Sequence, residues 1–154
     1  MDGDGILDMA LVLTGRKTPK DPLEERLFVL TGNSDGSYKL LSISAEFCHP
    51  GKFYNLDIAR NSLFAQMVEY ADATRESSYT LQFRYNGKLN DLELIGEETN
   101  AESYEKGSKD RTSINYLTGK VVHTMKIGSG TKTRAERIRK AVPLTRLNGH
   151  SCKR

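Results

Sequence analysis

The residues with the clearest chemical potential stand at the very start of the chain. Asp2, Asp4 and Asp8 are interleaved with two glycines in the run Asp-Gly-Asp-Gly-Ile-Leu-Asp. A hard cation such as Ca²⁺ takes about six to eight oxygen ligands, and carboxylates spaced by two in a tight, glycine-permitted turn can converge on one point. The spacing suits a calcium loop, although the usual D-x-D-x-D-G-x-x-D pattern would place its first ligand immediately before Met1. The alternative is a solvated acidic segment without a metal.

Other residue types that can do chemistry occur only singly or in pairs. Cys48 and His49 are adjacent, so on a strand their side chains would point to opposite faces, and no third group is evident that would orient a nucleophile and base. His123 stands among apolar residues, where a histidine on a sheet surface is expected. His150 and Cys152 are two potential zinc ligands, whereas a zinc site takes about four. Without a Walker loop, a G-x-S-x-G elbow or an H-E-x-x-H motif, we expect no enzyme activity.

The two cysteines and the start of the chain bear on the compartment. Cys48 and Cys152 could form a disulfide between tail and body in an oxidising compartment, or remain one buried and one exposed thiol. Met1 leads directly into a polar stretch instead of the basic and then apolar regions of a signal peptide. From the residues alone, the protein is either cytosolic or has lost its N-terminus.

Charge is unevenly distributed along the chain. Residues 120–154 contain ten Lys or Arg and one acid, Glu136, which gives +9, whereas the preceding 119 residues carry −6. The segment from Lys132 to Lys140 could contact phosphates, but no aromatic residues alternate with its charges, as they would in a nucleic-acid interface. We therefore expect a basic tail that is solvated or docks on the acidic body, and no nucleic-acid partner.

Length and composition favour a single domain. The chain has 154 residues, of which 37% are hydrophobic and 28% charged. A chain of this length can bury one core without disulfides and is too short for two independent cores. No apolar run approaches the roughly 18 residues of a membrane-spanning helix. We expect a β domain over residues 1–127 and a basic C-terminal tail over residues 128–154.

The first half of the chain contains five apolar runs of strand length, each bounded by turn residues. They cover residues 6–13, 26–31, 38–44 and the two halves of 53–70. The first run is continuously apolar, which is typical of a buried strand. The last two are joined at Arg60-Asn61-Ser62. The spacing of Leu63, Met67 and Tyr70 leaves a helix over residues 57–70 as the alternative.

The second half contains the clearest strand pattern. Residues 78–85 alternate between large apolar and polar side chains, which predicts a strand with one solvated face. Asn86-Gly87 is the preferred sequence of a type I′ turn, so residues 89–97 are expected to return antiparallel. A last hairpin joins residues 111–116 to residues 120–127.

Polar segments are expected to form loops. Glu98 to Lys109 and Arg16 to Glu25 lack apolar alternation and are predicted as loops. From Gly128 onward a linker and a basic segment are expected, and residues 141–144 could dock on the sheet. The remaining eight or so short strands predict an all-β or β-rich antiparallel meander, arranged as a sandwich or a partial propeller.

Three stretches carry a resemblance to known proteins. Residues 2–12 resemble the calcium-loop-plus-strand opening of FG-GAP (integrin α-type, VCBS-like) repeats. Residues 79–85 with 94–96, and residues 114–120, are similar to a group of uncharacterised bacterial exported proteins that carry a single such opening. The likeness covers about residues 2–125, and its motifs are structural and name no reaction.

The resemblance implies a metal site and a location. Asp2, Asp4 and Asp8 would be Ca²⁺ ligands, and Ile6 would contribute its backbone carbonyl. In this group an export signal precedes the loop, which implies a periplasmic or secreted protein.

Three functions are weighed on these patterns. The first is a non-enzymatic exported β domain, stabilised by Ca²⁺, that binds another protein. The second is a periplasmic immunity or inhibitor protein whose acidic body and two predicted loops, 16–25 and 98–109, would plug the site of a toxin. The third is a small hydrolase, in which Cys48→Ala would abolish activity and leave folding intact. We expect the first.

Overall fold

The protein is built from antiparallel strands. The computed structural model describes residues 3–15, 18, 20, 24–44, 52–72 and 74–138. Within these residues ten strands form a three-stranded and a seven-stranded sheet, with no helix and no closed barrel. The predicted all-β antiparallel meander is therefore confirmed, with more strands than the eight or so expected.

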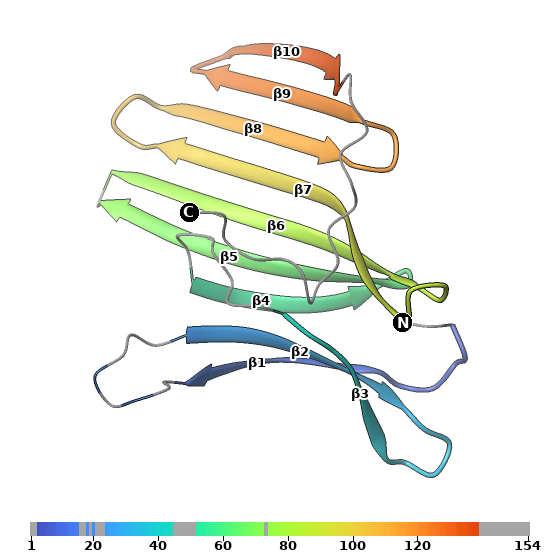
Figure 1. Ribbon diagram of the computed structural model, residues 1–154. Helices are drawn as coiled ribbons and strands as arrows, with labels where there is room; N and C mark the ends of the chain where they lie inside the picture. Colours follow the sequence, from blue (N-terminus) through green and yellow to red (C-terminus); the bar gives the residue numbers. More distant parts are fainter. Residues whose placement is uncertain are drawn as a thin grey trace.

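The N-terminal sheet has the order β1-β2-β3 (Figure 1). Its strands are β1 (Met9–Gly15), β2 (Glu24–Gly32) and β3 (Tyr38–Ile43). The turn between β2 and β3 closes through a hydrogen bond from the Asn33 amide to the Ser37 carbonyl, 2.9 Å long. Asp35 accepts hydrogen bonds from the Ser37 hydroxyl and amide, which lower the pKa of the Asp35 carboxyl. Gly36 has a φ of 82°, which glycine adopts without strain.

The larger sheet follows the chain strand by strand, in the order β10-β9-β8-β7-β6-β5-β4. Its strands are β4 (Lys52–Ala59), β5 (Ser62–Asp72), β6 (Arg75–Asn86), β7 (Asp91–Ser103), β8 (Ser108–Asn115), β9 (Lys120–Ile127) and β10 (Gly130–Arg137). In Figure 1 the three-stranded sheet lies at the β4 end of this sheet, whereas β8, β9 and β10 continue beyond it. The described strands therefore form two layers at the β4 end and a single layer across β8, β9 and β10.

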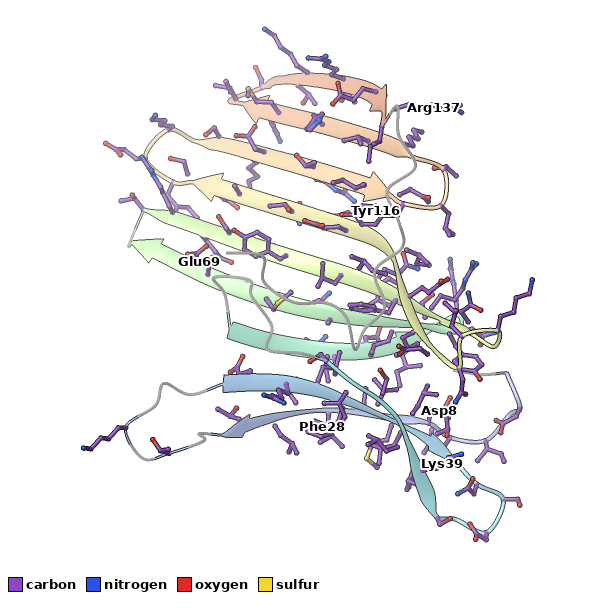
Figure 2. The ribbon with its side chains drawn as sticks, in the orientation of Figure 1. Asp8, Phe28, Lys39, Glu69, Tyr116 and Arg137 are labelled. Atoms are coloured by element: carbon purple, nitrogen blue, oxygen red, sulfur yellow. The ribbon has the colours of Figure 1, made fainter. Side chains whose placement is uncertain are left out.

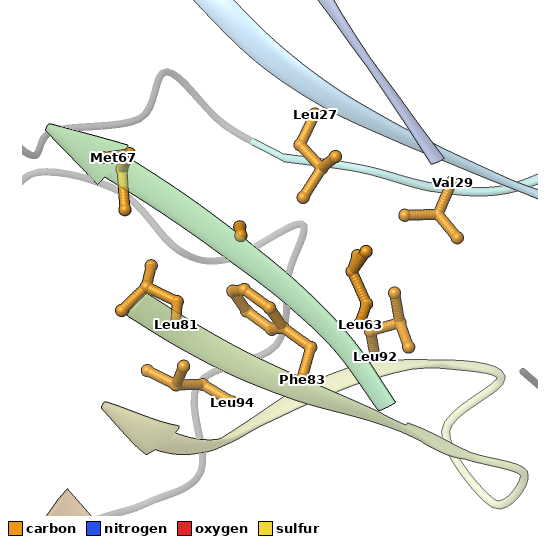
Figure 3. Close-up of a cluster of buried hydrophobic side chains, with 9 residues drawn as sticks. Leu27, Val29, Leu63, Met67, Leu81, Phe83, Leu92 and Leu94 are labelled. Atoms are coloured by element: carbon orange, nitrogen blue, oxygen red, sulfur yellow. The ribbon is translucent and has the colours of Figure 1, made fainter. Parts of the chain in front are cut away.

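The hydrophobic core lies between the two layers (Figure 3). Leu27 and Val29 of β2 face Leu63 of β5 and Phe83 of β6, and all four side chains are fully buried. Ala65, Met67, Leu81, Leu92 and Leu94 complete the cluster. These residues recur at every second position of their strands, which is the spacing that places side chains on one face of a sheet.

Two hairpins in the larger sheet test the predicted turns. Arg60 and Asn61 have φ values of 50° and 60°, as a two-residue type I′ turn requires, so the strand prediction for residues 53–70 is confirmed and the helical alternative is wrong. The hairpin after residue 85 is also confirmed, but its predicted two-residue turn is wrong. Four residues, 87–90, form that turn: the Leu89 amide donates to the Asn86 carbonyl at 3.0 Å, and Asn90 has the positive φ, 47°.

Two segments predicted as irregular are strands. The predicted loop from Glu98 to Lys109 is wrong, because β7 runs to Ser103 and β8 starts at Ser108. The predicted linker and tail from Gly128 is wrong over residues 130–137, which form β10. Both segments form strands through backbone pairing with their neighbours, although most of their side chains are polar. The toxin-inhibitor hypothesis therefore loses one of its two projecting loops.

Several predictions fall outside the residues that the structure describes. They are the ligand Asp2, the cysteine and histidine pairs Cys48-His49 and His150/Cys152, the docking segment 141–144 and most of the loop from Arg16 to Glu25.

Candidate functional site

The N-terminal loop is packed onto the end of β2. The Asp4 carboxylate accepts a hydrogen bond from the Ile6 amide at 2.8 Å. Asp8 is buried, and its carboxylate accepts one from the Gly32 amide at 3.2 Å. A Cβ atom at Gly32 would lie 2.4 Å from the Leu7 carbonyl oxygen, which is far closer than van der Waals contact allows. Glycine at position 32 therefore lets the loop reach β2, and Asp8 holds it there.

The predicted calcium ligands are only partly in view. Asp4, Ile6 and Asp8 belong to the loop just described, and Asp2 lies outside the described residues. Carboxylate and carbonyl oxygens are ligands that suit Ca²⁺, but each described aspartate already accepts a backbone N–H. Among the described residues no three His, Cys, Asp or Glu side chains gather into one group. The calcium site stays a prediction.

The three-stranded sheet is apolar on the side that faces away from the core. Since Leu27 and Val29 point into the core, their neighbour Phe28 points away from the larger sheet (Figure 2). The register places Leu11 and Ile43 beside Phe28 on the neighbouring strands. We call the apolar residues of this outward side the apolar face; they are Met9, Leu11, Leu13, Phe28, Leu30, Leu40 and Ile43, and the register places Arg26 beside Leu13 at its edge.

Three members of the apolar face are exposed, and the other four are half-buried. Leu13 is 52% exposed, Leu40 48% and Met9 40%. Leu7 of the N-terminal loop and Tyr38 at the start of β3 are exposed at the same end of the sheet. Isolated exposed leucines are ordinary, but a contiguous apolar surface over three strands is characteristic of an interaction site.

The sequence contained a signal for this face that we interpreted differently. The apolar run Met9 to Leu13 has no polar residue at alternate positions, which predicts a strand covered on both sides. Among the described residues, only one side of this strand is packed on the core: Ala10 and Val12 pack against it, and Met9 and Leu13 face outward. An uninterrupted apolar strand in this sheet therefore has one side packed on the core and exposed residues on the other.

One buried carboxylate joins the two layers. Asp91 at the start of β7 is 3% exposed and accepts hydrogen bonds from the Ser42 hydroxyl of β3 at 2.6 Å and from the Leu92 amide at 2.7 Å. Both bonds reach its Oδ1 atom, and Oδ2 receives none from the described residues. Buried hydrogen bonds to a charged group are among the stronger ones. This contact fixes how β3 sits on the larger sheet.

Beyond the core, two tyrosines bridge strands on the inner side of the larger sheet. Tyr116 donates to Glu97 at 2.8 Å and Tyr79 to Glu69 at 3.3 Å. Burial raises the pKa of Tyr116 strongly, and the hydrogen bond and charge of Glu97 add to the effect. Burial, followed by the charge of Glu69, also raises the pKa of Tyr79. Both phenols therefore stay protonated and act as hydrogen-bond donors at neutral pH.

The far end of the sheet carries a polar row across β8, β9 and β10. His123 is half-exposed on β9, as expected for a sheet-surface histidine. Its Nδ1 lies 3.0 Å from the Thr112 hydroxyl and its Nε2 lies 3.5 Å from Glu136, which also pairs with Arg134 at 3.1 Å. These contacts join three neighbouring strands, with the Thr112 hydroxyl and the Glu136 carboxylate on opposite sides of the imidazole ring.

No family model, curated protein or solved structure matches this chain. The FG-GAP resemblance therefore stays a prediction. In the described residues no helix is long and apolar enough to cross a membrane.

Proposed function

We propose that this chain is a non-enzymatic protein-binding β domain whose partner packs on the apolar face. The observation that carries the proposal is the continuity of that face across three strands, with Leu13 and Leu40 about half-exposed at its two sides. Burying such a surface stabilises a complex by roughly 25 cal/mol per Å². The partner is therefore expected to present an apolar surface of its own.

The size of the face favours a different protein over a second copy. The three strands are seven, nine and six residues long, and at spacings of about 4.8 Å between strands and about 3.3 Å per residue their average length of about seven residues spans roughly 330 Å² of sheet. Two such faces would bury roughly 660 Å² in total, whereas a stable complex buries at least roughly 1,200 Å². A different partner can add contacts to the exposed Leu7 and to the turn at residues 33–37, which lie at one end of the same sheet.

A calcium ion at the N-terminal loop would support the same function. Asp2, Asp4, Asp8 and the Ile6 carbonyl are the proposed ligands, and the ion would supply structural rigidity and no chemistry. By anchoring the loop it would hold Leu7 and the first residues of β1 in place for the partner. Export to the periplasm or the medium is part of this proposal and rests on the family resemblance.

The test compares the full-length parent with two variants, one that carries two new charges on the apolar face and one that carries a single new charge elsewhere. Leu13→Glu with Leu40→Glu places charge on the apolar face. Leu117→Glu changes a leucine of similar exposure, 45%, in the turn between β8 and β9, and is the matched control. Because all three side chains are about half-exposed, the variants should melt within a few degrees of the parent. The three proteins are immobilised, exposed to an extract of the cells that make the chain, and the retained proteins identified by mass spectrometry.

The proposal expects one protein that the parent and Leu117→Glu retain and that the double variant loses by about tenfold or more. That protein, once purified, must bind the three baits with the same ranking. Equal retention by all three baits, or no retained protein, would contradict the proposal. A parent that is dimeric by light scattering and becomes monomeric in the double variant would assign the face to a second copy instead.

A further inference from the structure

The last strand of the larger sheet has an open edge. In the part of the chain that the structure describes, β10 pairs only with β9, and all eight of its residues are exposed. Its backbone pattern can be derived from one bond: the Ile138 amide donates to the Gly119 carbonyl at 2.8 Å. Antiparallel pairs alternate between hydrogen-bonded and non-hydrogen-bonded. Lys132, Arg134 and Glu136 therefore form hydrogen-bonded pairs with β9, as Ile138 does with Gly119.

The intervening residues of β10 direct their backbone groups the other way. By the same alternation, the N–H and C=O groups that point to the open edge are those of Thr131, Thr133, Ala135 and Arg137. An edge of this kind is a template for a further strand. The sheet therefore ends in a row of backbone donors and acceptors that a peptide can pair with.

This end of the sheet is also basic. Residues 108–138 contain seven Lys or Arg and two acids, a net charge of +5, whereas residues 75–103 carry −3. Lys109 and Arg111 pair with Glu102 and Glu98 of β7. The basic residues that form no ion pair with any described residue are Lys120, Lys126, Lys132 and Arg137. Two of these four belong to β10.

We propose that β10 binds an extended acidic peptide segment of a partner protein as an eleventh strand. Backbone hydrogen bonds along the edge would supply affinity, and side chains at alternate positions would supply selectivity. Acidic residues on one face of the peptide would meet Lys132 and Arg134, which pairs with Glu136, beside a shallow groove that His123, Met125 and Asp110 also line. An acidic residue on the other face would meet Arg137, which Figure 2 places at the edge of the sheet.

Two other occupants fit the edge less well. A second copy would bring its own basic β10 against this one, and like charges on an edge strand oppose such pairing. Single-stranded nucleic acid needs aromatic side chains on which bases stack. Residues 108–138 contain one aromatic residue, Tyr116, and its hydroxyl is bonded to Glu97.

The test uses a fluorescent eight-residue peptide in which Glu and Thr alternate and one terminal Thr is replaced by Glu, so that both faces carry an acid, and measures fluorescence anisotropy on the full chain. Ala135→Pro removes an amide that points to the edge and none that bonds to β9, as edge strands tolerate, and Ala135→Val is the matched control with its N–H intact. Lys132→Glu with Arg137→Glu reverses two charges that form no ion pair with the described residues. A peptide of the same sequence with N-methylated alternate amides tests strand addition on the unchanged protein.

The proposal expects the parent and Ala135→Val to bind the peptide, with more than tenfold weaker binding by Ala135→Pro and by the charge-reversed variant. The N-methylated peptide should bind the parent more than tenfold more weakly as well. Binding of both peptides with equal affinity, or no binding by the parent, would overturn the proposal. So would an oligodeoxythymidine of equal charge that binds the parent and Ala135→Pro alike and displaces the peptide. The edge and the apolar face are separate surfaces, so either proposal can fail alone.

Discussion

The two ends of this molecule are held together in different ways. Where β1 to β3 cover the larger sheet, nine buried apolar side chains fill the space between two layers. Across β8, β9 and β10, Val121 is the only buried residue. That end depends on backbone pairing with β7 and on cross-strand side-chain pairs, each worth roughly 0.2–1 kcal/mol. The sheet therefore extends past its core. This extension, β8 to β10, gains little stability from burial, and most of its side chains are exposed or half-buried.

The largest expected effect comes from removing a core side chain at the two-layered end. Phe83→Ala should lower the free energy of unfolding by about 3–5 kcal/mol, because it removes a fully buried ring and leaves a cavity. Ile127→Ala on β9, where the side chain is 59% exposed, should lower it by less than about 1 kcal/mol. Urea unfolding of both variants gives the comparison. Similar losses in the two variants would mean that the extension is packed after all.

Calcium should act on the two-layered end. If the N-terminal loop binds Ca²⁺, saturation to about 100 times the dissociation constant would stabilise the fold by about 2.7 kcal/mol, and the midpoint of thermal unfolding would rise by several degrees relative to EGTA. Asp4→Ala should abolish the rise, whereas Asp57→Ala, which changes an exposed side chain of β4, should keep it. Identical midpoints with calcium and with EGTA would remove the ligand assignment.

The hydrogen bond between the layers should have an intermediate effect. Ser42→Ala leaves the buried Asp91 carboxylate without its hydroxyl donor and should cost about 1–3 kcal/mol. Thr133→Ala on β10, whose side chain is exposed, is the control and should cost less than about 0.5 kcal/mol. Equal stability of the two variants, measured by urea unfolding, would show that the Ser42 contact does not join the layers.

Most of the paired architecture could be predicted from the sequence because the core imposes a period of two. The strand over residues 78–85 follows from that period, and the turn at Arg60-Asn61 follows from the break between two apolar runs of strand length. The strand β10 could not be predicted, because none of its side chains is buried and hydrophobic alternation is absent. The same reason explains the error over residues 98–109, where β7 and β8 pair beyond the core.

The candidate site was harder to predict than the fold. The run Met9 to Leu13 revealed an apolar strand, but only the structure shows that Met9 and Leu13, on one side of it, are exposed. The aspartates of the N-terminal loop could be identified by spacing. The hydrogen bond from the Gly32 amide to the Asp8 carboxylate could not be predicted, because the two residues are 24 positions apart in the sequence.

A smaller effect, confined to alkaline pH, tests the tyrosines where the two ends meet. Burial and Glu97 raise the pKa of Tyr116 in the folded protein above about 10, its value in an unfolded chain. The stabilisation is therefore complete below pH 10 and is lost as the pH rises above it, because the unfolded phenol then releases its proton first. Tyr116→Phe should have a flatter decline in stability above pH 10 than the parent. Parallel declines in urea unfolding would contradict the assignment.

The smallest effect is expected from the ion pairs of the extension. Lys109→Ala breaks a pair with Glu102, 2.8 Å long, in which the lysine side chain is 62% exposed. Exposed pairs of this kind contribute about 0–1 kcal/mol, and raising the salt concentration should reduce the difference further. A loss above 2 kcal/mol in urea unfolding would indicate that charge pairs, and not backbone pairing, hold β8 to β7.

Native-state hydrogen exchange tests the difference between the two ends most directly. The amides of Leu81 and Phe83 in β6 should exchange only through global unfolding, whereas those of Lys132 and Arg134, which bond to β9, should exchange through local opening of the extension and be at least about 100-fold less protected. Equal protection in β6 and β10 would contradict the account, because it would place both ends in one cooperative unit with no readily opened edge.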